Sequence, residues 1–161
     1  MNIREATNSD PSTIAMLISE ANKDVAVKFG LNALNCPKHP SFCVESWVRA
    51  DLARGETYFM IEDGGTPIGC VAYESPSVGL AYLNRLSVLP GYRTRGAGAR
   101  LVQHIIAHAR SSSIRTISIG VIGEHLDLQD WYRKLGFFDG DVKHFSHLPF
   151  SVKYMSYTIS G

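Results

Sequence analysis

Apolar side chains recur with helical spacing in two segments of the first third of the chain. In the first segment, apolar residues stand at i, i+3, i+4 and i+7, which is typical of one buried helix face: Ile14, Leu17, Ile18 and Ala21. Asp10 and Pro11 precede them, and these residue types favour the N-cap and the first helical position. A second helix is predicted over residues 44–52, with Gly55 just past its end. Residues 24–43, rich in glycine, asparagine and proline, are predicted to form a long irregular connection, either without helix or with one helical turn. In a compact domain such a connection is often functional.

Strand signals follow in the middle of the chain. Residues 57–62 and 67–74 flank Asp63-Gly64-Gly65-Thr66, a strong hairpin signal, and residues 80–88 form a third strand after a turn at 75–77. A helix over 97–110, a β-branched strand over 116–122 and a helix that ends before Gly136 come next. With a first strand at 2–6 and last strands at 137–138 and 152–159, the predicted order is β-α-α-β-β-β-α-β-α-β-β, an α/β fold.

Composition excludes several classes of protein. The 161 residues fit one domain, 1–161, and 45% hydrophobic with 19% charged residues excludes global disorder. A net charge of +1 argues against a dedicated nucleic-acid binder. The three cysteines (Cys36, Cys43, Cys70) form no C-x-x-C pair, which favours a reduced, cytoplasmic protein. We see no secretory signal and no apolar run of the ~20 residues that a membrane helix needs.

Residues 86–101 run from a strand through a turn and a glycine loop into a helix. Free N–H groups at a helix N-terminus, close backbone approach at glycines and nearby arginines together make a phosphate cradle. A Walker A loop is excluded because Ala97 stands where its lysine must be. A dinucleotide fingerprint fails because Leu101 and Thr116 occupy the positions that need glycine and an acidic residue.

The motif Arg93-x-x-Gly96-x-Gly98, preceded by 88–92, resembles the acyl-CoA loop of the GNAT acetyltransferase superfamily. The strand 83–88 resembles the splayed fourth strand of that family, and 131–137 resembles its aromatic-Tyr-x-x-x-Gly-Phe signature. The element order matches from about residue 3 to 159. The resemblance implies a mixed, mostly antiparallel sheet of about six to seven strands flanked by about four helices.

The resemblance also implies acetyl-CoA, or another short acyl-CoA, as the cofactor. Its pyrophosphate would be held by backbone N–H groups of the glycine loop: Arg93, Thr94, Arg95, Gly96, Ala97, Gly98 and Ala99. The backbone of Leu86, Ser87 and Val88 would pair with the pantetheine arm and polarise the thioester carbonyl. Tyr132 would protonate the leaving thiolate, although as a sequence pattern it equally fits a core aromatic residue.

Two departures leave the general base open. His125 stands where many family members have an asparagine, and it could contact the cofactor, act as a base or be a loop residue. Where some members have a glutamate, the fourth strand has Asn84 and Arg85. Other base candidates are carboxylates and a histidine for which an ordinary surface role is the alternative: Glu74 (through a water), Glu124 and His39. The cysteines need no covalent role, because direct transfer in a ternary complex uses no enzyme nucleophile.

The predicted reaction is transfer of an acetyl group from acetyl-CoA to a primary amine, here expected to be a small molecule. A protein N-terminus or lysine as acceptor, and a non-catalytic acyl-CoA-binding module, are the alternatives. We expect a monomer or homodimer without nucleic-acid or membrane partners. Residues 24–43 are predicted to cover the acceptor side with Phe29, Leu31, Asn32, His39 and Phe42. Aromatic residues near the C-terminus either line the acceptor groove or pack on the sheet or a partner: Phe145, Phe150, Tyr154 and Tyr157.

Two charge patterns complete the prediction. Four arginines within sixteen residues that contain no acid predict one local positive site for the cofactor phosphates: Arg85, Arg93, Arg95 and Arg100. His104 and His108 are four apart on a helix, but Ile105 stands where a zinc-binding H-E-x-x-H motif needs glutamate. We therefore predict a solvent-exposed helix face there and no metal.

Overall fold

The computed structural model describes residues 1–160 and arranges seven strands in one sheet, in the order β1-β2-β3-β4-β5-β7-β6. All neighbouring strands are antiparallel except the pair β4–β5. The strands are β1 (Asn2–Glu5), β2 (Thr57–Asp63), β3 (Thr66–Ser77), β4 (Leu80–Val88), β5 (Thr116–Ile122), β6 (Phe138–His144) and β7 (Ser151–Thr158). The helices are α1 (Pro11–Ala21), α2 (Lys23–Lys28), α3 (Glu45–Ala53), α4 (Ala97–Ser111) and α5 (Leu126–Lys134), with short 3₁₀ helices at Pro40–Phe42 and Pro90–Arg95. The predicted α/β fold and mostly antiparallel sheet are confirmed. The last residue of the predicted domain, residue 161, lies outside the described residues.

The structure corrects the predicted elements in four places. Within residues 1–160 there are five α-helices rather than about four, because the connection predicted as irregular contains α2. A six-residue helix is too short to show a helical period in the sequence. Strand β3 continues through 75–77, where we predicted a turn, and β6 extends to His144. Asp10 stands at the start of α1, but its side chain makes no capping hydrogen bond there and turns back to Arg4 and Thr7.

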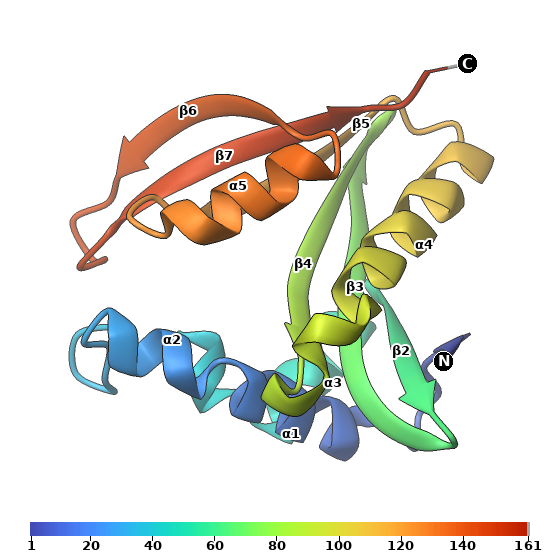
Figure 1. The fold of residues 1–161 in the computed structure, drawn as a ribbon, viewed down its shortest axis with the longest axis horizontal. Coiled ribbons are helices and arrows are strands. Elements are labelled where there is room, and N and C mark those ends of the chain that lie inside the picture. The colour runs from blue at the N-terminus through green and yellow to red at the C-terminus, as the bar shows by residue number, and fades with distance from the viewer. Residues whose placement is uncertain (161) are drawn as a thin grey trace.

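A β-bulge in β4 shapes the sheet. Cys70 pairs with Ser87 and Ala72 with Asn84, so Val71 of β3 lies opposite two residues of β4. One of these two, Arg85, has a φ of +54°. Such a bulge bends its strand and increases the twist. β4 and β5 pair only over 80–82 and 116–118, and beyond these residues the two strands diverge into a V (Figure 1).

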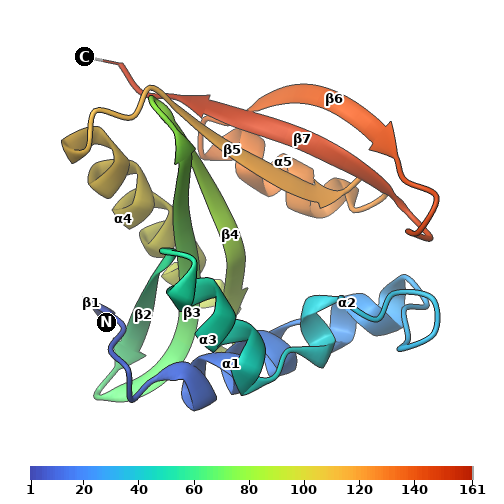
Figure 2. The ribbon, with the colours of Figure 1, turned by 180° about the vertical axis from the view of Figure 1, so that it is seen from behind.

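Helices pack on both faces of the sheet. α4 and α5 pack on the near face in Figure 1, over a core that includes Leu101, Ile105 and Ile117. α1 and α3 pack on the opposite face over β2 and β3, and Figure 2 shows α3 from that side. A third apolar cluster joins the two arms of the V at its open end: Ala26, Leu31 and Cys36, with Phe29, Ile122, Leu148 and Phe150 packed against them.

The Arg4–Asp10 pair makes one pH-dependent contribution to stability. Hydrogen bonds from Arg4 Nη1 (2.9 Å) and Nη2 (3.0 Å) lower the pKa of Asp10 from 3.8 to about 2. A depressed carboxyl pKa adds stability that is present above pH 3.8 and is lost as the pH falls toward 2. We expect Asp10→Asn to lower the free energy of unfolding by about 1–2 kcal/mol at pH 6, with the difference shrinking below pH 4. Urea unfolding of the wild type and the variant at several pH values measures this difference in the free energy of unfolding. A difference that does not change with pH would contradict the prediction.

Candidate functional site

The divergence of β4 from β5 leaves a cavity of about 470 Å³. Four parts of the chain line it: the α1–α2 junction, the β4 bulge, the glycine loop and the start of α5. Its lining includes Asn22, Asp24, Lys28, Leu86, Ser87, Val88, Arg93, Gly96, Gly98, Ala99, His125 and Trp131. Thus most of the residues that the sequence predicts for cofactor binding surround one cavity. Of the others, Thr94 and Arg95 lie exposed in the loop, and Ala97 and Tyr132 are buried.

The glycine loop ends in a helix N-terminus that no side chain caps. The 3₁₀ helix Pro90–Arg95 leads through Gly96, which has a φ of +79°, into α4. Glycine is the residue that adopts this left-handed conformation without strain. Within the described chain, no side chain caps α4, and its first backbone N–H groups have no partner within the helix. The positive end of a fifteen-residue helix therefore opens beside the cavity and can hold an anion.

Gly98 sets how closely α5 approaches this loop. A Cβ atom at position 98 would lie 3.2 Å and 3.3 Å from two ring carbons of Trp131. Because Trp131 also lines the cavity, the absence of a side chain at position 98 lets the indole pack against the start of α4. The glycine thus has a packing role in addition to freeing the backbone.

The Arg93 side chain is a structural clamp. Its Nη1 donates to Asp24 Oδ2 at 2.5 Å, and its Nη2 donates to Asp24 Oδ1 at 3.2 Å and to the Ala21 carbonyl. Its Nε donates to the Val88 carbonyl at 3.2 Å. These bonds hold the pKa of Asp24 below its usual value. Arg93 therefore ties the α1–α2 junction to β4 at the floor of the V.

The prediction that four arginines form one local positive site is wrong. Arg85 donates to Asp51 of α3 at 3.0 Å, on the far face of the sheet from α4. Arg95 stacks over Tyr92 and pairs with the exposed Asp63 at 3.3 Å. With Arg93 bound to Asp24, only Arg100 of the four makes no ion pair with any of residues 1–160. Backbone dipoles, rather than a pool of free guanidinium groups, supply most of the attraction for an anion here.

Tyr132 lies behind the cavity wall. Its side chain packs edge-on against Trp131 and Phe137, with ring centroids 5.0 Å and 5.2 Å away, and the residue is 4% exposed. Burial raises the pKa of its hydroxyl, so the group keeps its proton at neutral pH. Both predicted interpretations, core aromatic and proton donor, agree with this placement, and the donor role stays a prediction.

His125 lies in the cavity wall at the start of α5. Its ring is 5.4 Å from that of Phe29, and its buried Nδ1 has no hydrogen-bond partner among residues 1–160. Burial, and then the charge of Lys28, lower the pKa of His125, so the imidazole is neutral at pH 7. A neutral ring with an unused polar atom can hydrogen-bond a ligand in the cavity.

The other predicted bases are engaged elsewhere or lie outside the lining. Glu124 accepts hydrogen bonds from the backbone N (3.2 Å) and Oγ (2.9 Å) of Ser151, which lower its pKa against the opposing effect of burial. His39 is buried and bonds Ser41 through Nδ1. Glu74, on β3, pairs in register with Tyr82 near the closed end of the V. The three cysteines are free and buried, and burial raises their pKa values, which argues against reactive thiolates.

Sequence reasoning missed a buried carboxylate, Glu56, at the entry to β2. The residue is 6% exposed and accepts hydrogen bonds from Arg54 Nη2 (2.8 Å) and Asn84 Nδ2 (3.4 Å). Burial, and then the nearby charge of Asp51, raise its pKa. No motif marks this glutamate, because the partners that define its surroundings come from α3 and β4.

We predicted that His104 and His108 lie on a solvent-exposed helix face, and this prediction is wrong. Both are half-buried and pack edge-on against aromatic rings: Phe59 at 4.5 Å and 5.2 Å, and Tyr73 at 4.7 Å from His108. Among residues 1–160 no group of three potential ligands is arranged to hold a metal ion. In the same part of the chain, every helix is too short or too polar to cross a membrane.

Comparison with known proteins assigns the chain to a family. The model of the acetyltransferase (GNAT) family matches residues 30–137, so the chain belongs to that family. An uncharacterised N-acetyltransferase of Methanocaldococcus jannaschii is 28% identical over 91 residues, which are 53% of this chain and 40% of the relative. The chain thus matches less than half the length of that relative.

Solved structures show the same fold. The ribosomal-protein-S18-alanine N-acetyltransferase from Escherichia coli superposes with a TM-score of 0.79 at 16% identity, over 99% of this chain and 94% of that one. An aminoglycoside 6'-N-acetyltransferase complexed with coenzyme A superposes with a TM-score of 0.73 at 16% identity, over 100% and 98%. At these identities the likeness establishes the fold alone.

The Arg93–Asp24 clamp predicts how α2 is held. Asp24→Asn removes the charge while keeping the shape, so we expect the α2 backbone amides to exchange hydrogen about tenfold faster. Asp63→Asn is the matched control, because it breaks the exposed Arg95 pair of the same loop, which contributes little. Hydrogen exchange measured by mass spectrometry compares the two. Equal protection of α2 in both variants would show that the clamp does not hold the helix.

Proposed function

We propose that this chain is an N-acetyltransferase that moves an acetyl group from acetyl-CoA to a primary amine by direct transfer in a ternary complex. One observation carries the proposal: the uncapped N-terminus of α4 and the unpaired edge of β4 open into the same cavity. The first can take a pyrophosphate and the second an extended amide chain. Coenzyme A contains both groups, in that order.

The residues present fit this ligand. Backbone N–H groups of Ala97, Gly98 and Ala99 would hold the pyrophosphate at the helix terminus. One edge of 86–88 pairs with β3, whereas within residues 1–160 no strand of the sheet pairs with its other edge. That free edge would bind the pantetheine amides as an added strand and place a backbone N–H at the thioester carbonyl. When bound, acetyl-CoA supplies the activated acetyl group.

Two side chains near the cavity have suitable proton states. Tyr132 keeps its proton at neutral pH, so it could give that proton to the departing thiolate. Trp131, which lines the cavity, packs against Tyr132 on one side and against Gly98 at the start of α4 on the other. The neutral His125 would hydrogen-bond the cofactor through its unused nitrogen. No covalent intermediate on the chain is needed, in keeping with the buried cysteines.

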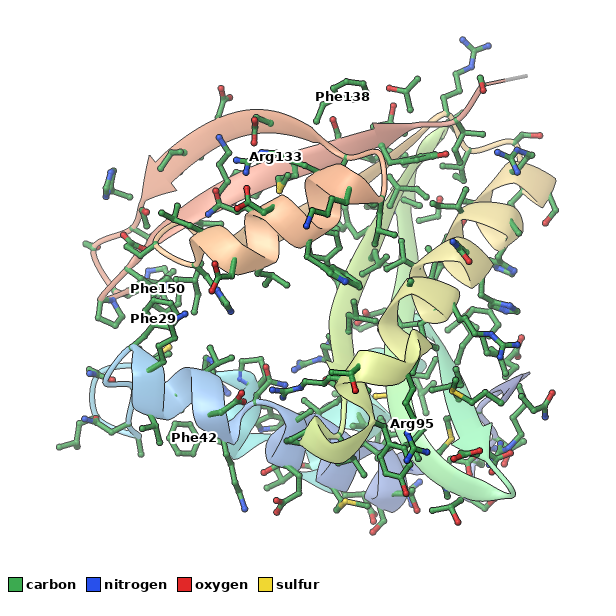
Figure 3. All side chains as sticks on the ribbon, viewed as in Figure 1. Phe29, Phe42, Arg95, Arg133, Phe138 and Phe150 are labelled. Carbon is green, nitrogen blue, oxygen red and sulfur yellow. The ribbon has the colours of Figure 1, made fainter. Side chains whose placement is uncertain are left out.

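A small amine is the acceptor that this geometry favours. The loop after α2 and the β6–β7 loop meet across the mouth of the V through the cluster of Leu31 and Cys36 with Phe29, Leu148 and Phe150. Phe29 and Phe150 lie side by side there in Figure 3. We take this contact to disfavour an extended peptide, which would have to pass between the two loops, and to favour a small molecule. The same contact supports the prediction that residues 24–43 cover the acceptor side.

Two measurements test the proposed function. A hundredfold excess of acetyl-CoA over its Kd should stabilise the protein by about 2.7 kcal/mol. Release of free CoA thiol should then occur with at least one of 2-phenylethylamine, spermidine and alaninamide, and more slowly with a hexapeptide that has a free alanine N-terminus. No stabilisation would overturn the proposal. Stabilisation without thiol release would instead identify a non-catalytic acyl-CoA-binding module.

Gly98 gives a sharper test of the binding site. Gly98→Ala places a methyl group against Trp131, so we expect acetyl-CoA binding to weaken about tenfold, or roughly 1.4 kcal/mol. Gly91→Ala is the matched control, because a Cβ there meets nothing within 4 Å. Isothermal titration calorimetry gives both Kd values. If the two variants bind acetyl-CoA equally, the packing of α5 against α4 does not shape the site.

A further inference from the structure

The face of the sheet opposite α4 carries a row of polar side chains beside the V. Residues that alternate along β3 with Cys70 and Ala72 face α1 and α3, so Glu74 shares that face. Register then places Tyr82 and Asn84 of β4 and Ser118 of β5 on the same face. All four polar side chains are half-exposed, and Figure 2 shows no helix over β5 on this side. A ligand can therefore approach the V from the face that the cofactor loop does not occupy.

Glu56 lies at the edge of this polar face. It stands two residues before Tyr58, which packs under α1 and α3, and its carboxylate accepts a hydrogen bond from Asn84. Asn84 belongs to the same strand as Leu86–Val88, two residues before the cavity lining begins. Through Asn84, a buried carboxylate thus reaches the strand at which the amine and the thioester must meet.

The neighbouring Asp51 accepts three side-chain hydrogen bonds, whereas Glu56 accepts two. Asp51 accepts from Tyr58 Oη (2.6 Å), Arg85 Nε (3.0 Å) and Arg54. Although burial acts to raise the pKa of Asp51, these partners outweigh it and hold the pKa low. Glu56 shares Arg54 and has one long bond to an amide, so burial and Asp51 raise its pKa. Of the two acids, Glu56 therefore binds a proton more tightly.

We propose that Glu56 is the proton acceptor for an amine that enters on this face. The proposal rests on the proposed function and names a residue that the sequence does not single out. The ammonium group gives one proton to the Glu56 carboxylate and becomes a free amine. The amine nitrogen then forms a bond to the acetyl carbon, the carbon–sulfur bond breaks, and the sulfur leaves as CoA thiolate. As the amide forms, the nitrogen releases its second proton and the thiolate takes up one, so the products are the acetylated amine, the CoA thiol and protonated Glu56.

The charges around Glu56 suit a cationic acceptor. From α3 and the residue after it Glu56 faces Asp51 and Arg54, from β3 Glu74, and from β4 Asn84, while Arg85 of β4 pairs with Asp51. The three acids Asp51, Glu56 and Glu74 outnumber the two arginines by one, so this group of side chains has a net charge of −1 when all are ionised. Arg54 pairs with both Asp51 and Glu56, and Arg85 pairs with Asp51, whereas Glu74 makes no ion pair with any of residues 1–160. A net negative charge attracts an ammonium group and disfavours an anionic acceptor. Loss of the proton to Glu56 then prepares the amine for attack.

Glu56→Gln tests the assignment, because glutamine keeps the shape and one oxygen that can accept from Arg54 but cannot take the proton. With the fastest amine of the panel above, we expect kcat at pH 7 to fall about 100-fold or more. The Kd for acetyl-CoA should stay within twofold. The loss should shrink as the pH rises toward the pKa of the amine itself, since a free amine needs no base. A merely structural role would not give that dependence on pH.

Glu62→Gln is the matched control. Glu62 is a carboxylate of β2 that also accepts from an arginine, Arg4 at 3.3 Å, and it lies at the other end of the strand. We expect wild-type kcat at every pH in this variant. If Glu56→Gln melts below the assay temperature, Glu56→Asp replaces it, and its shorter carboxylate should keep the pH profile with a lower kcat.

The outcomes separate the two proposals. A wild-type protein that releases no thiol with any amine overturns the proposed function, and the role of Glu56 with it. A wild-type protein that turns over, with a Glu56→Gln variant of similar kcat at pH 7, overturns the role of Glu56 alone. A Glu56→Gln defect of equal size at all pH values also overturns it, because that result identifies a structural residue.

Discussion

The bulge at Arg85 and Leu86 is the constraint on which the rest of the structure depends. Because two residues of β4 lie opposite one of β3, β4 bends away from β5 after only three paired residues. The sheet thereby gives up backbone pairing with β5 along 83–88, and residues 86–88 of this unpaired edge line the cavity. Backbone N–H and C=O groups on such an edge are free to hydrogen-bond a ligand. The same distortion therefore creates both the cavity and an edge to which an extended ligand can pair.

The V is held open to a fixed width by contacts at both ends. At the floor, Arg93 joins α1 and α2 to β4, and at the mouth, Phe29 and Phe150 belong to a cluster that joins the two arms. A chain with a net charge of +1 can bind a strongly anionic cofactor when backbone groups, rather than arginine side chains, attract the anion. The arginines near the loop mostly neutralise local acids, while the α4 terminus and its free N–H groups face the cavity.

The sequence predicts what local pattern determines. The glycine loop, the helix that follows it and the aromatic signature around Tyr132 could be located because their spacing is visible over short stretches, and the structure places the loop and Trp131 around one cavity. The side-chain partners could not be predicted. Arg93 meets Asp24 across 69 positions, and Asn84 meets Glu56 across 28, so only the folded sheet brings them together. The prediction of a positive site from four nearby arginines was wrong for the same reason, because the acidic residues that pair with these arginines lie on other elements.

The burial of Glu56 is itself an argument for its role. A carboxyl whose pKa is raised on folding makes the folded state less stable once the pH exceeds that pKa, because the charge is better solvated in the unfolded chain. Arg54 and Asn84 offset only part of this penalty, whereas Asp51 beside it has its full set of donors. A glutamine would keep the hydrogen bond from Arg54 on its carbonyl oxygen and would carry no charge. A carboxylate held at this cost, next to the strand at which the proposed function brings an amine and a thioester together, supports the assignment of Glu56 as the proton acceptor.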